Sequence, residues 1–214
     1  MMRTEPGNFH APVADQSRQR HLVSAEELRI EITRKSLHLL ILVALPLASI
    51  SPWLAIGALT AGSIIYGTSE YLRHRGIQIP IIARLTEQAA RKRDGNRFVI
   101  GPLTLAAGAI LTFALYDPLP ARLAILALAF GDGFSSLAGK AFGRIPMPFS
   151  GGKSVEGSAV CFGLVFVTSA LVTGHIGESA ILALFTAIVE LLPTKDWDNV
   201  IIPLTTGLIA SLLF

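Results

Sequence analysis

The sequence contains little of what a soluble or secreted domain needs. Its single cysteine, Cys161, excludes a disulfide framework and a cysteine-based zinc site, and its apolar surroundings favour a packing role. Charged residues make up only 15% of the 214 residues, whereas hydrophobic residues make up 51% and the mean hydropathy is +0.57. A soluble domain needs more charge to solvate its surface. The chain is therefore expected to lie in a lipid bilayer.

Acidic residues are outnumbered by basic ones, which leaves a net charge of +3 and an isoelectric point of about 9.3. The basic residues flank hydrophobic runs and are not interleaved with solvent-facing aromatics, so nucleic-acid binding is not expected. In the predicted topology, all but one of the 18 Lys and Arg residues fall on one side of the membrane, the exception being Arg122. The positive-inside rule places that side, with the N-terminus, in the cytoplasm. We expect an inner (plasma) membrane protein with its active site on the cytoplasmic side.

The N-terminal residues 1–23 are polar and contain no apolar run of signal-peptide length, which predicts a disordered tail. Ser24 and Glu27 form a capping-box pattern, in which each side chain satisfies a backbone donor of the other residue. A helix is expected to begin there. Residues 24–214 are predicted to form one membrane domain, because the length leaves no room for a second one.

The apolar runs predict an all-α fold, a polytopic membrane helical bundle of about seven transmembrane helices. A kink is expected at Pro46 in the first span, and the fourth span is too short unless it continues beyond Gly131-Asp132. Residues 73–98 form a basic segment with one apolar face, which is typical of a helix lying in the membrane interface. The expected spans are 37–50, 53–72, 99–116, 119–130 with its continuation, 155–173, 176–192 and 200–214.

Asp132 is the first candidate for chemistry, because a carboxylate at membrane depth costs about 2.5 to 3.5 kcal/mol and needs a metal ion, a base or water beside it. On one helix, Ser136, Gly139 and Lys140 would share its face. Gly139 and Gly143 also form a small-xxx-small surface for close helix packing. Packing alone is the simpler alternative, but it leaves Asp132 unexplained.

A glycine-rich turn, Gly151-Gly152-Lys153-Ser154, precedes the fifth span. Such a turn offers backbone N–H groups and the positive end of a helix to a phosphate, with Lys153 as an added cation. The turn is similar to the end of a Walker A loop, but that pattern would need glycine at Met147 and a preceding strand. Phosphate binding is therefore predicted without a P-loop fold.

Further oxygen ligands fall on the same predicted face. Together with Asp132, they could hold Mg²⁺ against the phosphates of a nucleotide. These candidate metal ligands are Glu156, Glu190, Asp198 and Asn199.

A basic pair, Arg34 and Lys35, stands at the entry to the first span. Topology and lipid-headgroup contact would explain both residues without catalysis. His38 lies one turn after Arg34, and a lone histidine in a span more often forms a hydrogen bond between helices than catalyses a reaction.

Taken in order, these motifs resemble the polyprenol kinase family, which includes dolichol kinase, phytol kinase and the CTP-dependent diacylglycerol kinase. The resemblance runs from about residue 30 to the C-terminus. It implies transfer of the γ-phosphate of CTP or ATP, with Mg²⁺, to the hydroxyl of a polyprenol, phytol or diacylglycerol type lipid. The motifs are Arg34-Lys35-x-x-His38, Gly131-Asp132, Gly139-Lys140-x-x-Gly143-Arg144, Gly152-Lys153-Ser154-x-Glu156-Gly157-Ser158, Glu190, and Asp198-Asn199-x-x-x-Pro203-Leu204.

The resemblance and the residue chemistry together suggest roles for each motif. We expect Asp132, Lys153, Arg34 and Lys35 to be catalytic. The expected nucleotide-binding residues are Gly139, Lys140, Gly143, Arg144, Gly151, Gly152, Lys153, Ser154 and Gly157. Expected partners are the lipid alcohol, the nucleotide and the bilayer, and small-residue faces leave a homo-oligomer open.

Two other functions fit parts of the sequence. The same motifs resemble the phosphatidate cytidylyltransferases, which usually carry a proline before the loop lysine and end in His-Gly-Gly and paired aspartates. This chain has Gly151-Gly152 before Lys153 and Asp198-Asn199 near its end. A small transporter would place its site near the midplane between internal repeats, and the sequence shows no repeat.

Overall fold

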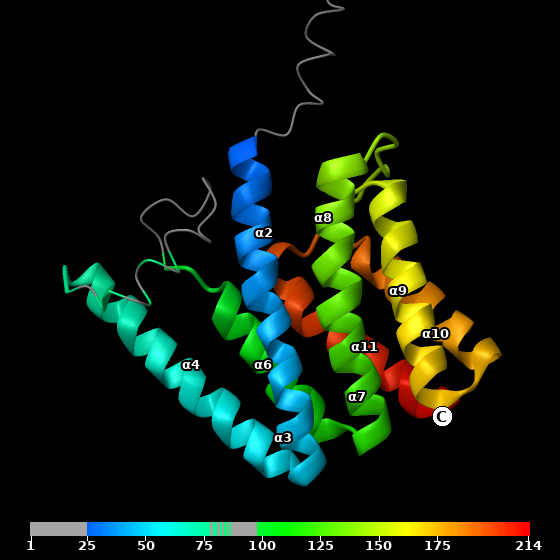
Figure 1. Ribbon diagram of the computed structural model, residues 1–214, viewed down its shortest axis with the longest axis horizontal. Coiled ribbons are helices and arrows are strands. Elements are labelled where there is room, and N and C mark those ends of the chain that lie inside the picture. The colour runs from blue at the N-terminus through cyan, green and yellow to red at the C-terminus, as the bar shows by residue number, and fades with distance from the viewer. Residues whose placement is uncertain (1–24, 78, 81, 83, 85, 87–97) are drawn as a thin grey trace, which may run out of the picture.

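The computed structural model describes residues 25–77, 79, 80, 82, 84, 86 and 98–214 (Figure 1). Within these residues the regular structure is helical, apart from an isolated bridge between Pro146 and Ser154. The prediction of an all-α fold is confirmed. The expected tail, the Ser24 cap and most of the segment 73–98 lie outside the described residues.

The first helical pass is broken near its middle, as the sequence predicted. Helix α2 spans Ala25–Leu39, a 3₁₀ turn covers Leu40–Val43, and α3 spans Ala44–Ile50. Pro46 lies in α3 and has no N–H to donate to the carbonyl of residue 42, so the backbone tightens just before it. Helix α4, Pro52–His74, then returns with proline at its start.

The fourth predicted span does continue beyond Gly131-Asp132. Helix α6 spans Gly101–Leu115, and α7, Pro118–Leu126, runs through a π-helical turn, Ala127–Asp132, directly into α8, Gly133–Phe142. Together the last three elements form one rod of 25 residues. A π turn inserts one residue into the helical ladder and is frequent at functional sites.

The last three helices begin and end close to the predicted bounds. They are α9, Val155–Thr173, α10, Ile176–Glu190, and α11, Asp198–Leu213, with a short 3₁₀ turn, Lys195–Trp197, before α11. Ser154 caps α9 by accepting a hydrogen bond from the Gly157 amide, and Gly174 ends it at a φ of 74°. Figure 1 shows the long helices alternating in direction between the two ends of the bundle.

Several helices approach each other closely because one of them presents a glycine. A Cβ on Gly108 would lie 2.1 Å from the backbone oxygen of Asn199, which brings α6 and α11 together. A Cβ on Gly207 would lie 2.5 Å from the Tyr116 ring. Cys161 is fully buried in an apolar cluster with neighbours such as Val165, as its predicted packing role requires.

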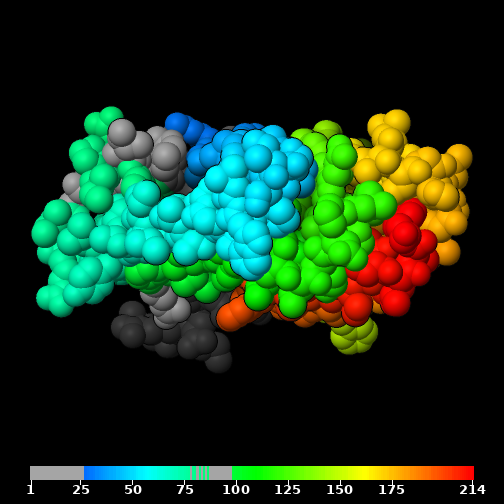
Figure 2. Space-filling model, turned by 90° about the horizontal axis from the view of Figure 1, so that it is seen from below, coloured from blue at the N-terminus to red at the C-terminus, as the bar shows by residue number. Residues whose placement is uncertain are grey.

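The outer surface carries many large apolar side chains. Two helical rods, Pro118–Phe142 and Val155–Thr173, are long and apolar enough to cross a membrane. Trp53 is 77% exposed and Leu171 is 82% exposed. Figure 2 shows the end of the bundle at which α3, α7 and the C-terminus meet. Apolar exposure on this scale marks a surface that contacts lipid or another protein.

Candidate active site

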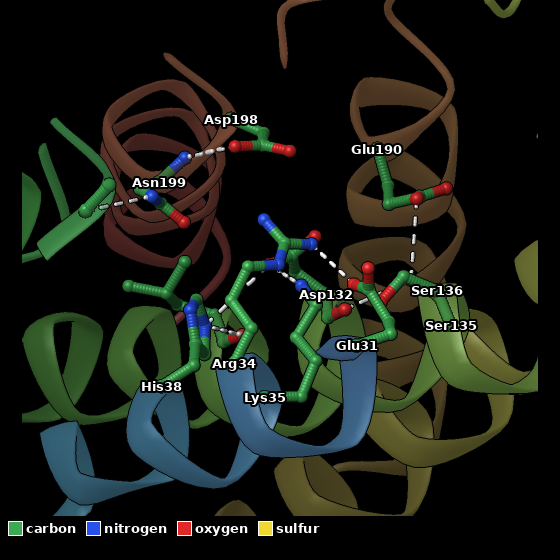
Figure 3. A network of polar contacts seen from close by, with 12 residues as sticks. Glu31, Arg34, Lys35, His38, Asp132, Ser135, Ser136, Glu190, Asp198 and Asn199 are labelled. Atoms are coloured by element: carbon green, nitrogen blue, oxygen red, sulfur yellow. Dashed lines mark hydrogen bonds and ion pairs between the residues drawn. The ribbon is translucent and has the colours of Figure 1, made fainter. Parts of the chain in front are cut away.

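A polar cleft of about 620 Å³ lies between α2, α8, α9, α10 and α11, beside the loop that joins α8 to α9. Figure 3 shows charged side chains converging there from separate helices. Asp132 and Lys153 both line the cleft, so the two residues on which the predicted chemistry most depends share one site. The other charged side chains lining it are Arg34, Lys140, Arg144, Glu190, Lys195 and Asp198.

Asp132 lies at the end of the π turn and is almost completely buried. Its Oδ2 accepts a hydrogen bond from Lys35 Nζ at 2.6 Å, and both side chains are only 3% exposed. His38 Nε2 lies 3.1 Å from the carbonyl oxygen of Leu128 and 3.6 Å from Asp132 Oδ2. His38 therefore joins α2 to the π turn, and Lys35 reaches the site through Asp132.

Glu31 is the main site residue that the sequence reasoning missed. Its carboxylate is fully buried, accepts a hydrogen bond from Ser136 Oγ at 3.1 Å and pairs with both Arg34 and Lys140. Burial alone would raise its pKa, but the charge of Arg34 and hydrogen bonds from both cations bring the pKa of Glu31 well below its usual range. An acid one turn before a basic pair was the available clue.

Lys153 is held in place by the end of α10. Its ammonium lies 3.0 Å from Glu190 Oε1 and also donates to the Glu190 carbonyl. Ser135 Oγ donates to the same Oε1 at 3.3 Å. The backbone reaches this position because Gly151 and Gly152 adopt φ values of 70° and 102°, which strain other residues.

The first turn of α9 is less open to a phosphate than the glycine-rich pattern suggested. The amides of Lys153, Val155 and Gly157 already donate, to Ser150 Oγ, the Ile145 carbonyl and Ser154 Oγ. These groups compete with any bound anion. The positive charge at the cleft therefore comes mainly from side chains.

Two of the predicted metal ligands, Glu156 and Asn199, have other partners. The Glu156 carboxylate accepts the amide of Arg144 at 3.0 Å, which fixes the loop after α8. Asn199 Nδ2 donates to Thr104 Oγ1 at 3.0 Å, which ties α11 to α6. Neither residue is among those that line the cleft.

The glycines between α8 and α9 serve close packing as well as lining the cleft. A Cβ on Gly143 would lie 2.2 Å from the Gly139 oxygen, and one on Gly157 would lie 2.8 Å from the Ser135 oxygen. The packing alternative thus accounts for these glycines. It does not account for the buried charges of Asp132 and Lys35, which need a polar reason to lie there.

Comparison with known proteins relates these motifs to named enzymes. A probable chloroplastic phytol kinase of Triticum aestivum is 36% identical over 100 residues, which cover 39% of this chain and 33% of that protein. Probable phytol kinase 1 of Oryza sativa is 28% identical over 158 residues, 65% of this chain and 50% of the relative. The chain is related to the phytol kinases. The resemblance seen in the motifs is thereby confirmed.

The phytol kinase relatives extend beyond the part that matches. The chain spans between a third and about half of the length of the curated relatives it matches, 33% in the wheat protein and 52% in that of Zea mays. No family model matches the chain, and no solved structure matches it. The relationship to phytol kinases therefore rests on sequence similarity to these plant proteins.

The acidic side chains at the cleft bear on whether a metal ion can bind there. In the described residues, no group of three or more acidic, histidine or cysteine side chains is arranged to hold a metal ion. Burial, followed by the negative charge of Asp132, raises the pKa of Asp198 to about 6. The two carboxylates carry like charges that repel each other, and a cation between them would relieve that repulsion. Mg²⁺ fits such a pair, because it usually binds one or two carboxylates and takes its other ligands from phosphates and water.

Proposed function

We propose that this chain is an integral membrane lipid-alcohol kinase, which transfers the terminal phosphate of CTP or ATP to the hydroxyl of a polyprenol, phytol or diacylglycerol type lipid. The observation that carries the proposal is the single cleft lined by both Asp132 and Lys153. These residues come from two of the motifs that resemble polyprenol kinases, and the named relatives are phytol kinases.

The proposed setting is a bundle of about seven transmembrane helices with the N-terminus and the cleft on the cytoplasmic side. The exposed apolar surface and the alternating helices support this arrangement. Arg122 supports the orientation, because it lines a separate hollow with Pro46, Pro52 and Tyr116 at the other end of the helices. The basic residues that line the cleft, Arg34 and Lys153 among them, then fall on the cytoplasmic side.

The reaction needs positioning and charge more than covalent help from the protein. The oxygen of the lipid hydroxyl forms a bond to the γ-phosphorus, and the bond from that phosphorus to the β–γ bridging oxygen breaks. The products are a lipid phosphate and a nucleoside diphosphate, and the hydroxyl proton is released. We assign Arg34, Lys140 and Lys153 to the charge on the phosphate oxygens.

Asp132 and Asp198 are the proposed carboxylates that face the phosphates. With Mg²⁺ bound, the ion would supply positive charge that neutralises the triphosphate, and these two acids would hold it. In this role Lys35 orients Asp132 through their hydrogen bond. An alternative role for Asp132 is to accept the hydroxyl proton, since its carboxylate lies at the wall of the cleft.

The proposal is tested with purified protein in lipid micelles, CTP or ATP, Mg²⁺ and each lipid alcohol in turn. We expect a lipid monophosphate with CDP or ADP, and we expect EDTA to abolish turnover. Asp132→Ala and Lys153→Ala should lose activity by about 100-fold or more, while Arg122→Gln at the opposite end should match the wild type. A nucleotidyl lipid with pyrophosphate would instead indicate a cytidylyltransferase. Full activity in Asp132→Ala would refute the proposal.

A further inference from the structure

Another hollow lies on the outer side of α8, and its lining is apolar throughout. It has a volume of about 640 Å³ and is bounded by α2, α8 and α9. The side chains that shape it include Leu28 and Ile32 of α2, Phe134 and Leu137 of α8, and Leu164 and Val167 of α9. We call it the α8 groove. Its size is within the range of small-ligand sites, but its lining offers nothing to a nucleotide.

The α8 groove and the polar cleft are separated by the width of one helix. Ser136 and Lys140 line the cleft from one face of α8, whereas Leu137 and Ala138 line the groove from the other. Ala141, in the last turn of the helix, lines both hollows. A molecule lying in the groove thus reaches the rim of the cleft beside Lys140.

We propose that the α8 groove holds the hydrocarbon chain of the acceptor lipid, so that its hydroxyl is presented at the rim of the cleft. This inference rests on the proposed kinase function and adds the place and chemical class of the acceptor tail. A long, flexible isoprenoid or acyl chain is the occupant that matches an apolar groove joined to a charged site. The groove opens on the surface formed by exposed Ile32 and Phe134, which permits entry from the side.

Selection in such a groove depends on shape. Lipid tails are as apolar as leucine, so moving a chain from bilayer to groove brings little hydrophobic gain. A side chain that fills the groove should therefore act by excluding a long chain. It should leave a short alcohol free to reach the cleft.

Gly163 offers the test. It lines the α8 groove, is half-buried, and a Cβ added to it would meet nothing within 4 Å. Gly163→Leu therefore adds bulk to the groove at a position where the first added carbon meets no neighbour. Gly67→Leu is the matched control, because Gly67 of α4 is also half-buried with open space around it and lies outside the groove.

The experiment compares a long isoprenoid alcohol with short, water-soluble prenol as acceptors, at saturating nucleotide. In Gly163→Leu we expect kcat/KM for the long alcohol to fall by about 10-fold or more, with prenol and the nucleotide KM changed less than about twofold. Gly67→Leu should resemble the wild type. Phe134→Ala, which widens the groove, should relax discrimination between the alcohols and provides a second variant if Gly163→Leu does not fold.

The outcomes separate this inference from the proposed function. If the wild type phosphorylates neither alcohol, the kinase proposal itself has failed. An active wild type whose Gly163→Leu variant loses both alcohols equally, or neither, would refute the groove alone. A change in oligomeric state on size exclusion in Gly163→Leu would also refute it, because the groove would then be an interface between copies.

Discussion

Lys35 donates a hydrogen bond to Asp132 at 2.6 Å across a separation of 97 residues, and both side chains are buried. This ion pair joins α2 to the π turn, and Asp132 lines the cleft. Removing either partner leaves the other charge buried without an opposite charge as close as the one it lost. Such a change in a buried pair costs about 3 to 5 kcal/mol, whereas removing both charges can cost far less.

We therefore expect Lys35→Met and Asp132→Leu each to lower the melting temperature in detergent by several degrees. The double variant should be more stable than either single variant, because no lone charge remains buried. Kinase activity should stay absent in the double variant. Arg29→Gln, on the exposed surface of the same helix, is the control for α2. Strictly additive losses of stability would contradict the pairing.

Glu31 is expected to position two of the cations that we propose bind phosphate. Without its carboxylate, Arg34 and Lys140 lose their shared partner and can move away from the cleft. We predict that Glu31→Gln raises the nucleotide KM by about 10-fold or more with a smaller change in kcat. Steady-state kinetics against CTP and ATP would measure this. An unchanged KM, with Arg29→Gln as reference, would assign Glu31 a purely structural role.

The same residue predicts a dependence of stability on pH. The pKa of Glu31 in the folded protein is lower than its unfolded value of 4.5, so its stabilising effect is complete above that value. That contribution is lost as the pH falls below 4.5 toward the folded-state pKa. The melting temperature of the wild type should therefore fall more steeply between about pH 5 and pH 3 than that of Glu31→Gln. Parallel curves for the two proteins would contradict this assignment.

Gly108 is predicted to be the least replaceable glycine of the α6–α11 contact. A Cβ there would lie 2.1 Å from the backbone oxygen of Asn199, which cannot move without shifting α11. We expect Gly108→Ala to destabilise the protein by about 2 kcal/mol or more and to reduce activity through displacement of Asp198. Gly57→Ala, in open space on α4, should be neutral or stabilising. Thermal unfolding of both variants in detergent would decide.

The helices and their ends could be predicted because they depend on local chemistry. Proline at the start of α4, Ser154 before α9 and Gly174 after it mark bounds that short-range hydrogen bonds and steric limits impose. The continuation of the fourth pass beyond Asp132 also followed from length, since a shorter run could not cross a bilayer. Most motifs that the sequence singled out line one cleft. This could be predicted because they occur near helix ends on one predicted face.

The partners of individual side chains could not be predicted in this way. Glu31 contacts Ser136 and Lys140 because α2 packs on α8. The sequence of α2 alone does not show that these residues are its neighbours. The Glu156 carboxylate accepts a hydrogen bond from the amide of Arg144, and the Asn199 side chain donates one to Thr104. Each outcome depends on which donor lies within reach after the helices have packed.

By itself the sequence determined an apolar, all-helical chain, the order of its helices and the segments that hold its charged residues. Only the tertiary structure decided which charges neutralise one another, where the π turn places Asp132, and that an apolar groove lies behind the polar cleft. The physical reason is how far apart along the chain the interacting residues lie. Helix formation depends on residues within about four positions of each other, whereas ion pairs and cavities depend on residues that folding brings together from distant parts of the chain.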